Sequence, residues 1–563
     1  METHGAVRTP DISYIALNMP KQKIEMKHQM RSTNEEAMAT VNSEDGDTKR
    51  GLTRRAWLKL SAGASAATLT GACRQTWGQT PQGAAEGVRS STVFQNPLFA
   101  GDYADPAILR VGEDFYMTHT SYSYAPGLVV WHARDLVNWT PVSQALNETL
   151  GEIWAPELVE HDGRYFIYFP MGGRLFVVHA EHPRGPWSAP INLKVDGIDP
   201  GHVVGPDGKR YLYFAGGKVV ELSADGFSTV GQPKKIYDGW AFPREWKTEG
   251  VWLESPKLTK RNEYYYLISA EGGTAGPPTS HMAVVARSKS PLGPWENSPY
   301  NPLIHTYSAD EDWWSVGHGT LVSTPDDRWY FVYHGYRKGF QTLGRNTLME
   351  PVEWTGDGWP RAPLGARRSE PMPAPMGIAQ RPMIELSDDF KAHALKATWG
   401  AWKETDMSRY KVGDGALIVR AKGNSYAESS PLTIRARDES YVVQVVAKIE
   451  AESSAALGLE YNPKVAVFVE LKRGQVNVHG PKEKLAAREW AAETAWFQMV
   501  VRKNRVEILV SEDGQKWQSL IADFDASGFN QNEQRGGFQA ARPALAASGN
   551  GNTRFTDFRY RAL

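Results

Sequence analysis

The chain repeats one pattern of apolar and polar positions five times between residues 105 and 330. Each copy has a short apolar run, a polar turn such as Asp162-Gly163, and a second apolar run that is rich in aromatic residues. This pattern is typical of a β-hairpin. The first residues of the five copies are Asp105, Ala155, Asp199, Glu254 and His318.

The spacing of these copies indicates how the hairpins assemble. A period of roughly 50 residues that is built from hairpins favours the four-stranded blades of a β-propeller. Five such blades close a ring without exposed sheet edges. We therefore expect the first residues of the five copies to meet at one mouth of a central channel.

Residues 94–375 are assigned to this propeller, and a different pattern follows it. Proline residues at positions 371, 373 and 375 break regular structure and mark a boundary. In residues 384–563, apolar strands are separated by turns at irregular intervals, which predicts a β-sandwich of the jelly-roll type. The clearest of these strands are 441–446, 465–469 and 506–510. The predicted fold class is all-β, a five-bladed β-propeller followed by a β-sandwich.

The first 93 residues are interpreted as three segments. Residues 1–52 form a polar extension, disordered or wrongly assigned, and residues 74–93 form a linker rich in Gln, Gly, Ser and Thr. Residues 53–73 resemble a twin-arginine export signal, because Arg54-Arg55 precedes an apolar run that is too short to span a bilayer. The signal predicts a periplasmic or secreted protein, or a lipoprotein with a lipid anchor at Cys73.

Composition narrows the choice of partners. The formal net charge is −1 without a basic stripe, which argues against nucleic acid as a partner. The sequence has no apolar run of the length that a transmembrane segment needs. Cys73 is the only cysteine, so a disulfide framework and a cysteine-based metal site are excluded within the chain. The 20 tryptophans suit an all-β core, and tryptophan is also the usual side chain for stacking on sugars.

Several motifs, taken in order over residues 96–360, resemble glycoside hydrolase family 43. They are Gly101-Asp102-Tyr103-Ala104-Asp105-Pro106, Trp154-Ala155-Pro156-Glu157, Ile198-Asp199-Pro200, Glu254-Ser255-Pro256-Lys257-Leu258, Gly317-His318-Gly319 and Gly344-Arg345-Asn346-Thr347-Leu348. The resemblance implies a five-bladed propeller that requires no cofactor. Residues 384–563 are similar to the concanavalin-like sandwich that follows the propeller in the family's β-xylosidases.

Hydrolysis of a glycosidic bond needs one carboxylic acid to protonate the leaving oxygen and one carboxylate on the other face of the sugar. The resemblance assigns Asp105 as general base, Glu254 as general acid and Asp199 as the residue that modulates the pKa of the acid. Because the family inverts the anomeric centre, a water must fit between base and sugar. This predicts about 6.5–9.5 Å between the carboxyl groups of Asp105 and Glu254. Glu249 is the alternative acid, but it lacks the following proline of the family pattern.

Four further residues are candidates for contacts with the substrate. Arg345 resembles the family's arginine, which holds a substrate hydroxyl and the modulating carboxylate; a surface salt bridge is its alternative. Trp154 is expected to form a wall of the sugar pocket, and Trp314 is a weaker candidate. His318 resembles the family's channel histidine, which contacts a central water, or a calcium ion through water; a core histidine is its alternative.

The sandwich suggests two additional features. Asp388 and Asp389 near its start and Asp557 near its end would share a calcium ion if the first and last strands pair, and solvated turns are the equal alternative. A loop of the sandwich over the propeller mouth would close it into a pocket, which favours removal of single terminal sugars.

The sequence therefore predicts an exported, inverting exo-glycosidase that acts on oligosaccharides or polysaccharides of the plant type. The terminal sugar is β-xylosyl or α-L-arabinofuranosyl, and a galactose-type sugar stays open. A carbohydrate-binding propeller without catalysis is the non-enzyme alternative, although all three acids are present. A retaining fructosidase of the other five-bladed group is disfavoured, because Ala104-Asp105-Pro106-Ala107-Ile108 replaces that group's Asn-Asp-Pro-Asn-Gly.

Overall fold

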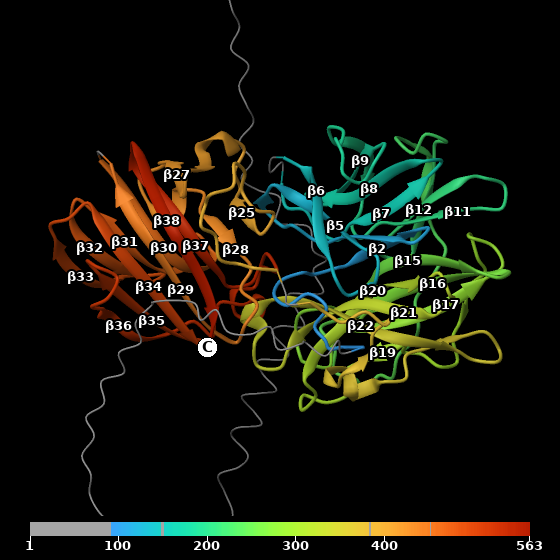
Figure 1. Ribbon diagram of the computed structural model, residues 1–563. Coiled ribbons are helices and arrows are strands. Elements are labelled where there is room, and N and C mark those ends of the chain that lie inside the picture. The colour runs from blue at the N-terminus through green and yellow to red at the C-terminus, as the bar shows by residue number, and fades with distance from the viewer. Residues whose placement is uncertain (1–91, 148–150, 382–383, 451) are drawn as a thin grey trace, which may run out of the picture. The chain divides into compact units, whose positions relative to one another are not determined.

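The computed structural model describes residues 92–147, 151–381, 384–450 and 452–563. The predicted extension 1–52, the export signal 53–73 and all but the last two residues of the linker 74–93 lie outside the described residues. The described chain forms five blade sheets followed by the two large sheets of a sandwich (Figure 1). The predicted fold class is confirmed.

Each blade is an antiparallel sheet, and the first strands of neighbouring blades contact one another. The strands are β2 (Ala107–Val111), β3 (Asp114–Thr118), β5 (Gly127–Ala133) and β6 (Thr140–Leu146) in blade one; β7 (Glu157–His161), β8 (Arg164–Met171), β9 (Arg174–Ala180) and β10 (Ile191–Asp196) in blade two; β11 (Gly201–Val204), β12 (Arg210–Phe214), β13 (Lys218–Leu222) and β14 (Thr229–Lys235) in blade three; β15 (Leu253–Arg261), β16 (Tyr264–Glu271), β17 (Met282–Ser288), β18 (Glu296–Asn297) and β19 (Ile304–His305) in blade four; and β20 (Trp313–Ser323), β21 (Trp329–Arg337), β22 (Arg345–Trp354) and β23 (Pro360–Arg361) in blade five.

Apolar packing between the blades closes the ring. Five clusters of buried residues join the blades in pairs: one and two, two and three, three and four, four and five, and five and one. Side chains of β8 alternate between two of them, because Phe166 and Tyr168 pack towards blade three whereas Ile167 and Phe169 pack towards blade one. Strands that are buried on both faces are apolar at every position, which explains the aromatic second run of each repeat.

The start of the described chain is tied to the last blade. Strand β1 (Val93–Phe94) pairs with β24 (Met372–Pro373), and Phe99 forms a bridge with Thr347 of β22. The side chain of Asn96 donates to the Met349 carbonyl at 2.9 Å. Blade one is thereby held against blade five at the point where the ring closes.

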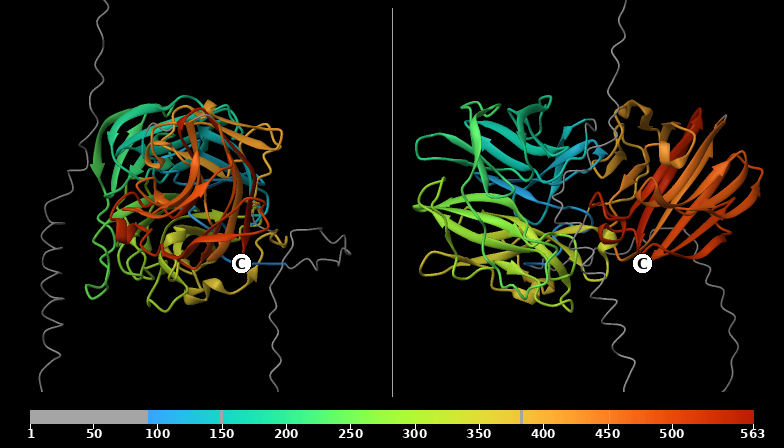
Figure 2. Two further views of the ribbon diagram at one scale, coloured as in Figure 1. Left: turned by 90° about the vertical axis from the view of Figure 1, so that its left-hand side faces the viewer. Right: turned by 180° about the vertical axis from the view of Figure 1, so that it is seen from behind.

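The sandwich packs its two sheets around one large apolar core (Figure 2). One sheet contains β25 (Trp399–Trp402), β28 (Leu432–Ile434), β30 (Glu452–Asn462), β31 (Val465–Lys472), β32 (Gly474–His479), β33 (Lys484–Trp490) and β37 (Arg542–Asn550), and the other contains β26 (Tyr410–Gly413), β27 (Ala416–Arg420), β29 (Ser440–Ile449), β34 (Thr494–Arg502), β35 (Arg505–Ser511), β36 (Gln518–Asp525) and β38 (Asn552–Ala562). The short helices are η1 (Gln341–Leu343), η2 (Gly365–Ser369), η3 (Met407–Arg409), η4 (Tyr426–Glu428) and α2 (Gln531–Gln534). In the described part of the chain, none of the helices has the length and apolar character that crossing a membrane requires.

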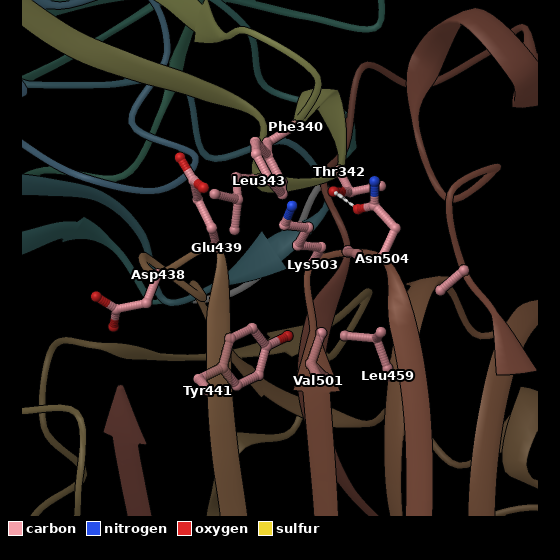
Figure 3. A pocket seen from close by; sticks show the side chains of 12 residues that line it. Phe340, Thr342, Leu343, Asp438, Glu439, Tyr441, Leu459, Val501, Lys503 and Asn504 are labelled. Carbon is pink, nitrogen blue, oxygen red and sulfur yellow. Dashed lines mark hydrogen bonds between the residues drawn. The ribbon is translucent and has the colours of Figure 1, made fainter. Parts of the chain in front are cut away.

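The propeller and the sandwich share a sheet. Strand β4 (Tyr124–Ala125), which lies between the second and third strands of blade one, pairs with β25 at the edge of a sandwich sheet. On blade five, the Thr342 hydroxyl of η1 donates to Oδ1 of Asn504 at 2.7 Å, beside a crevice that Leu343 and Tyr441 also line (Figure 3). The sequence pattern predicts two separate domains. In the structure, the pairing of β4 with β25 and the hydrogen bond of Thr342 with Asn504 both cross the boundary between them.

Candidate active site

The first residues of the blades gather at the propeller mouth. Oδ1 of Asp105 in blade one lies 3.3 Å from Nδ1 of His318 in blade five. Oδ2 of Asp199 in blade three accepts from the backbone amide of Ser255 at 3.3 Å, and Ser255 follows Glu254 in blade four. The charge of Asp105 acts on both Asp199 and Glu254, so the three predicted acids form one group, in which Asp105 and Asp199 are buried and Glu254 is partly exposed.

The backbone at these positions has an unusual conformation. The φ angles are 58° at Asp105, 56° at Asp199, 51° at Ser255 and 51° at His318. Residues other than glycine seldom adopt this left-handed region, and it recurs at functional sites. It interrupts the regular pleat, so that these side chains are not restricted to either face of a blade. Blade two, which begins with Ala155, does not show the feature.

Asp105 is held in its ionised form. Nη1 of Arg345 donates to its Oδ1 at 2.8 Å, and the Thr120 hydroxyl donates to its Oδ2. Nδ1 of His334 lies 3.0 Å from Oδ1. Burial by itself would raise the pKa of Asp105, but the charge of Arg345, together with the imidazoles of His318 and His334, holds this pKa well below its usual range.

Asp199 and Glu254 are shifted in the opposite direction. Burial, and after it the charge of Asp105, raises the pKa of Asp199 to about 7. Burial, and after it the charges of Asp199, Glu249 and Asp105, raises the pKa of Glu254 to about 8. The group therefore combines a carboxylate that stays ionised with a carboxylic acid that stays protonated near neutral pH.

A positively charged side chain spans blades two, three and four beside the acids. Nζ of Lys257 donates to Oε2 of Glu157 at 2.6 Å and to the carbonyls of Pro156 at 2.7 Å and Pro200 at 3.1 Å. Lys257 is 1% exposed, and Pro200 directly follows Asp199. All three ammonium protons are thus used to join the first strands of three blades.

Aromatic side chains from both domains meet beside the acids. The rings of Trp154 and Phe538 lie edge to face at 5.9 Å, and the guanidinium of Arg345 lies 5.5 Å from the centre of the Phe538 ring. Asn532, on the same segment of the sandwich, exchanges two hydrogen bonds with the backbone of Gly276 in blade four. Residues 531–538 therefore reach from blade four to blade two across the mouth. Trp314 lines a crevice with Tyr336 and Asn532 instead.

Asp105, His318 and His334 form the one cluster, within the described residues, whose potential metal ligands lie within 4.8 Å of one another. Calcium binds about six to eight oxygen atoms, whereas this cluster offers one carboxylate and two imidazoles. Arg345 already donates to Oδ1 of Asp105, and its charge would oppose a divalent cation. These side chains do not fit direct calcium ligation, and contact of His318 with calcium through water stays a prediction.

The acids of the sandwich do not gather into a metal site in the part of the chain that the structure describes. Asp388 accepts from the indole of Trp399 at 2.9 Å and lies 3.6 Å from the ammonium of Lys396. Asp389 pairs with Lys391, and Asp557 pairs with Arg559. Each carboxylate is thus satisfied by a nearby N–H group, so the shared calcium ion expected there has no preformed ligand set.

Sequence reasoning missed several residues of the site. His334, Tyr122 and Asp102 lie outside the first positions of the repeats, and their contacts to Arg345 and Asp105 follow only from the closed ring. Phe538 lies more than 400 residues from Asp105, and no local pattern marks it. Lys257 was visible within the motif of Glu254, because a lysine inside an apolar strand needs a buried partner.

Known proteins resemble the chain in sequence and in fold. Residues 94–360 match glycosyl hydrolases family 43. The chain is 31% identical to a non-reducing end α-L-arabinofuranosidase of Bacteroides ovatus, over 63% of this chain and 70% of that protein. It is 32% identical to a xylan 1,3-β-xylosidase of Vibrio sp, over 60% of this chain and 70% of that protein.

Solved structures agree with this likeness. The family 43 protein BlXynB of Bacillus licheniformis superposes with a TM-score of 0.75 at 26% identity, over 84% of this chain and 100% of that chain. A xylan β-1,4-xylosidase from Bacillus halodurans superposes with a TM-score of 0.73 at 27% identity, over 83% of this chain and 99% of that chain. The chain belongs to glycoside hydrolase family 43 and is a glycoside hydrolase.

Replacement of Lys257 by methionine is expected to destabilise the propeller. It removes the cation that pairs with the mostly buried Glu157 and leaves two buried carbonyls without a donor. Loss of one partner of a buried ion pair costs about 3–5 kcal/mol. The free energy of unfolding in urea measures the effect.

Lys289→Met is the matched control, because the ion pair of Lys289 with Glu263 in blade four is exposed on both sides. Such pairs contribute about 0–1 kcal/mol. Adding Glu157→Gln to Lys257→Met should recover part of the lost stability. Equal stability of Lys257→Met and Lys289→Met would show that the buried pair does not hold the blades together.

Proposed function

We propose that the protein is an exported, inverting exo-glycosidase that removes terminal β-xylosyl or α-L-arabinofuranosyl residues from plant-type polysaccharide fragments. One observation carries the proposal: the environments of Asp105 and Glu254, on different blades of one mouth, shift the pKa values of the two carboxyl groups in opposite directions. Acid–base hydrolysis of a glycoside requires this division of protonation states.

Each carboxyl group has a defined task in the proposed reaction. Protonated Glu254 gives its proton to the glycosidic oxygen as the bond from that oxygen to the anomeric carbon breaks. Ionised Asp105 takes a proton from a water, and the oxygen of that water forms the new bond to the anomeric carbon from the opposite face. Burial and, after it, repulsion from the charge of Asp199 keep Glu254 protonated, and Arg345 keeps Asp105 ionised.

The exo mode of action is supported by the residues that cover the mouth. Trp154 and Phe538 stand beside Arg345, and residues 531–538 reach across the mouth between two blades. A segment in this position would obstruct a continuous polymer and so favours binding of the end of a chain. Known relatives act on both candidate sugars, since one is an α-L-arabinofuranosidase and another a xylan 1,3-β-xylosidase.

Hydrolysis of aryl glycosides tests the proposed function. We expect turnover of a β-xyloside, an α-L-arabinofuranoside or both, and proton NMR should first detect the sugar with inverted anomeric configuration. Release of the retained anomer would contradict the assignment of Asp105 as general base. Absence of turnover on a panel that includes a galactoside would favour a carbohydrate-binding propeller.

Three variants test the assignment of the base and the acid in this assay. Asp105→Ala should lower kcat by about 100- to 10,000-fold, because water then lacks its base. Glu254→Gln should be impaired most on substrates with a poor leaving group, since a good leaving group needs no proton. An equal loss on both kinds of substrate would argue against Glu254 as the acid, and Glu249→Gln tests the alternative residue.

The pH dependence of Asp199→Asn tests the modulating role. The alkaline limb of kcat/KM reports ionisation of the general acid, whose pKa is about 8 in Glu254. At that pH Asp199 is largely ionised, because its own pKa is about 7, and its charge opposes ionisation of Glu254. Removing this charge lowers the pKa of Glu254, so the alkaline limb should move to lower pH. An unchanged alkaline limb in Asp199→Asn would exclude the role.

Export is proposed from Arg54-Arg55 and the apolar run that follows. Fractionation of cells that produce the full chain should place the wild type beyond the inner membrane or on it. Replacing both arginines by lysine should retain the protein in the cytoplasm, and an unchanged distribution would contradict twin-arginine export. If Cys73 carries a lipid anchor, Cys73→Ser should move the protein from the membrane fraction to the soluble fraction.

A further inference from the structure

A buried ion pair joins the sandwich to the propeller close to the site. Arg542 is the first residue of β37, and its Nη2 donates to Oδ2 of Asp102 in blade one at 2.9 Å. The side chains are 2% and 1% exposed. Asp102 lies three residues before Asp105. The guanidinium of Arg542, from the sandwich, therefore contacts the segment that contains the proposed base.

The contacts continue from this pair to the base itself. The Tyr122 hydroxyl donates to Oδ1 of Asp102 at 3.1 Å, and its oxygen accepts from Nη2 of Arg345 at 3.0 Å. Nη1 of Arg345 donates to Oδ1 of Asp105 at 2.8 Å. Since a phenol has one proton, donation to Asp102 leaves the Tyr122 oxygen free to accept from Arg345. Every side chain in this series of contacts is buried.

Positive and negative side chains alternate along this series of contacts, and the alternation stabilises each buried charge. Arg542 and Arg345 are cations, and Asp102 and Asp105 are anions separated by the Tyr122 hydroxyl. Asp102 also accepts from the backbone amide of Arg345 at 3.4 Å, so it faces the same residue that pairs with the base. Arg435 also interacts with the charge of Asp102, but among the described residues the ion pair of Asp102 is with Arg542. Without Arg542, the buried carboxylate of Asp102 would lose this pair and would compete with Asp105 for the guanidinium of Arg345.

We propose that Arg542 of the sandwich is a positioning residue of the active site, which neutralises Asp102 and so leaves the charge of Arg345 to Asp105. The inference rests on the proposed function of Asp105 as base. Arg542 does not touch the reacting atoms. It acts through Asp102, Tyr122 and Arg345.

The surroundings of Arg542 fit this task. The amide of Ala541 donates to the carbonyl of Thr342 at 2.8 Å, which fixes the start of β37 against blade five. The guanidinium of Arg542 lies 3.8 Å from the centre of the Tyr124 ring. Glu460 is opposite Arg542 in the sheet, but burial raises its pKa to about 8, so it is largely neutral near pH 7. Arg435, in the same interface, stacks on Tyr103 at 4.7 Å.

The test compares the pH profiles of full-length variants on whichever aryl glycoside the wild type hydrolyses. The acidic limb of kcat/KM reports the base, which must be ionised. In Arg542→Met, Asp102 competes for Arg345, so the ion pair of Arg345 with Asp105 weakens. The pKa of Asp105 then rises, and the acidic limb moves to higher pH. We expect kcat to fall roughly ten- to a hundredfold, because small displacements of positioning groups have effects of this size.

Two further variants separate charge from packing. Arg542→Lys keeps a cation and should stay closer to the wild type in both kcat and acidic limb. The double variant Asp102→Asn, Arg542→Met removes both charges and should recover activity relative to Arg542→Met alone, which a double-mutant cycle quantifies. If Arg542→Met does not fold, the test uses these two variants. Both are expected to keep the acidic limb near that of the wild type, and a shift of the limb to higher pH in the double variant would contradict the proposal.

Arg409→Met is the matched control. Arg409 is also a buried arginine of the sandwich, and it pairs with Glu404 at 2.7 Å. The other hydrogen bonds of its side chain go to Tyr410, Arg420 and Ser429, which all belong to the sandwich. This variant should lose stability without a shift of the acidic limb. The inference is overturned if Arg542→Met folds and keeps the wild-type acidic limb and kcat, or if the double variant shows no recovery. Failure of the proposed function appears separately, as absence of turnover in the wild type.

Discussion

The arrangement of the site depends on one constraint, which is that the buried carboxylate of Asp105 must be compensated by a cation. An ionised carboxylate in a protein interior is strongly unfavourable unless it is paired and hydrogen-bonded. Arg345 supplies the pair at 2.8 Å, and Thr120 adds a hydroxyl donor. Because Arg345 starts β22 of the last blade and Asp105 precedes β2 of the first, this pair can form only when the ring is closed. Ring closure therefore brings Arg345 to Asp105, which allows the carboxylate to stay ionised when it is buried.

The same burial has opposite consequences at the neighbouring acids. Asp199 is buried as Asp105 is, and Glu254 is partly exposed, but the group has one guanidinium and its shortest contact goes to Asp105. Desolvation and like-charge repulsion therefore dominate at the other two carboxyl groups and raise their pKa values. A single asymmetrically placed arginine thus leaves one carboxyl group ionised and the other two with raised pKa values, about 7 for Asp199 and about 8 for Glu254.

The repeating parts of this arrangement could be predicted from the sequence. Hairpin turns and apolar runs occur at a near-constant spacing, so the five blades and the first positions Asp105, Asp199, Glu254 and His318 follow from pattern alone, with the family resemblance adding their chemistry. What the pattern could not supply is contact between elements. Tyr122 and Asp102 occupy a connection without periodicity, and Phe538 and Arg542 come from the other domain. Their distance from Asp105 along the chain contains no information about distance in space.

The contribution of the sandwich is concentrated in one short segment. Residues 531–538 cover the mouth and bring Phe538 over Arg345, and four residues later Arg542 reaches Asp102. Strand β4 of blade one, which follows Tyr122 closely, joins a sandwich sheet through β25. A shift of the sandwich relative to blade one would therefore displace Phe538 from Trp154 and Arg345, and Arg542 from Asp102, at the same time. Under the proposed function, enclosure of the substrate and ionisation of the base would then depend on the same segment of the sandwich.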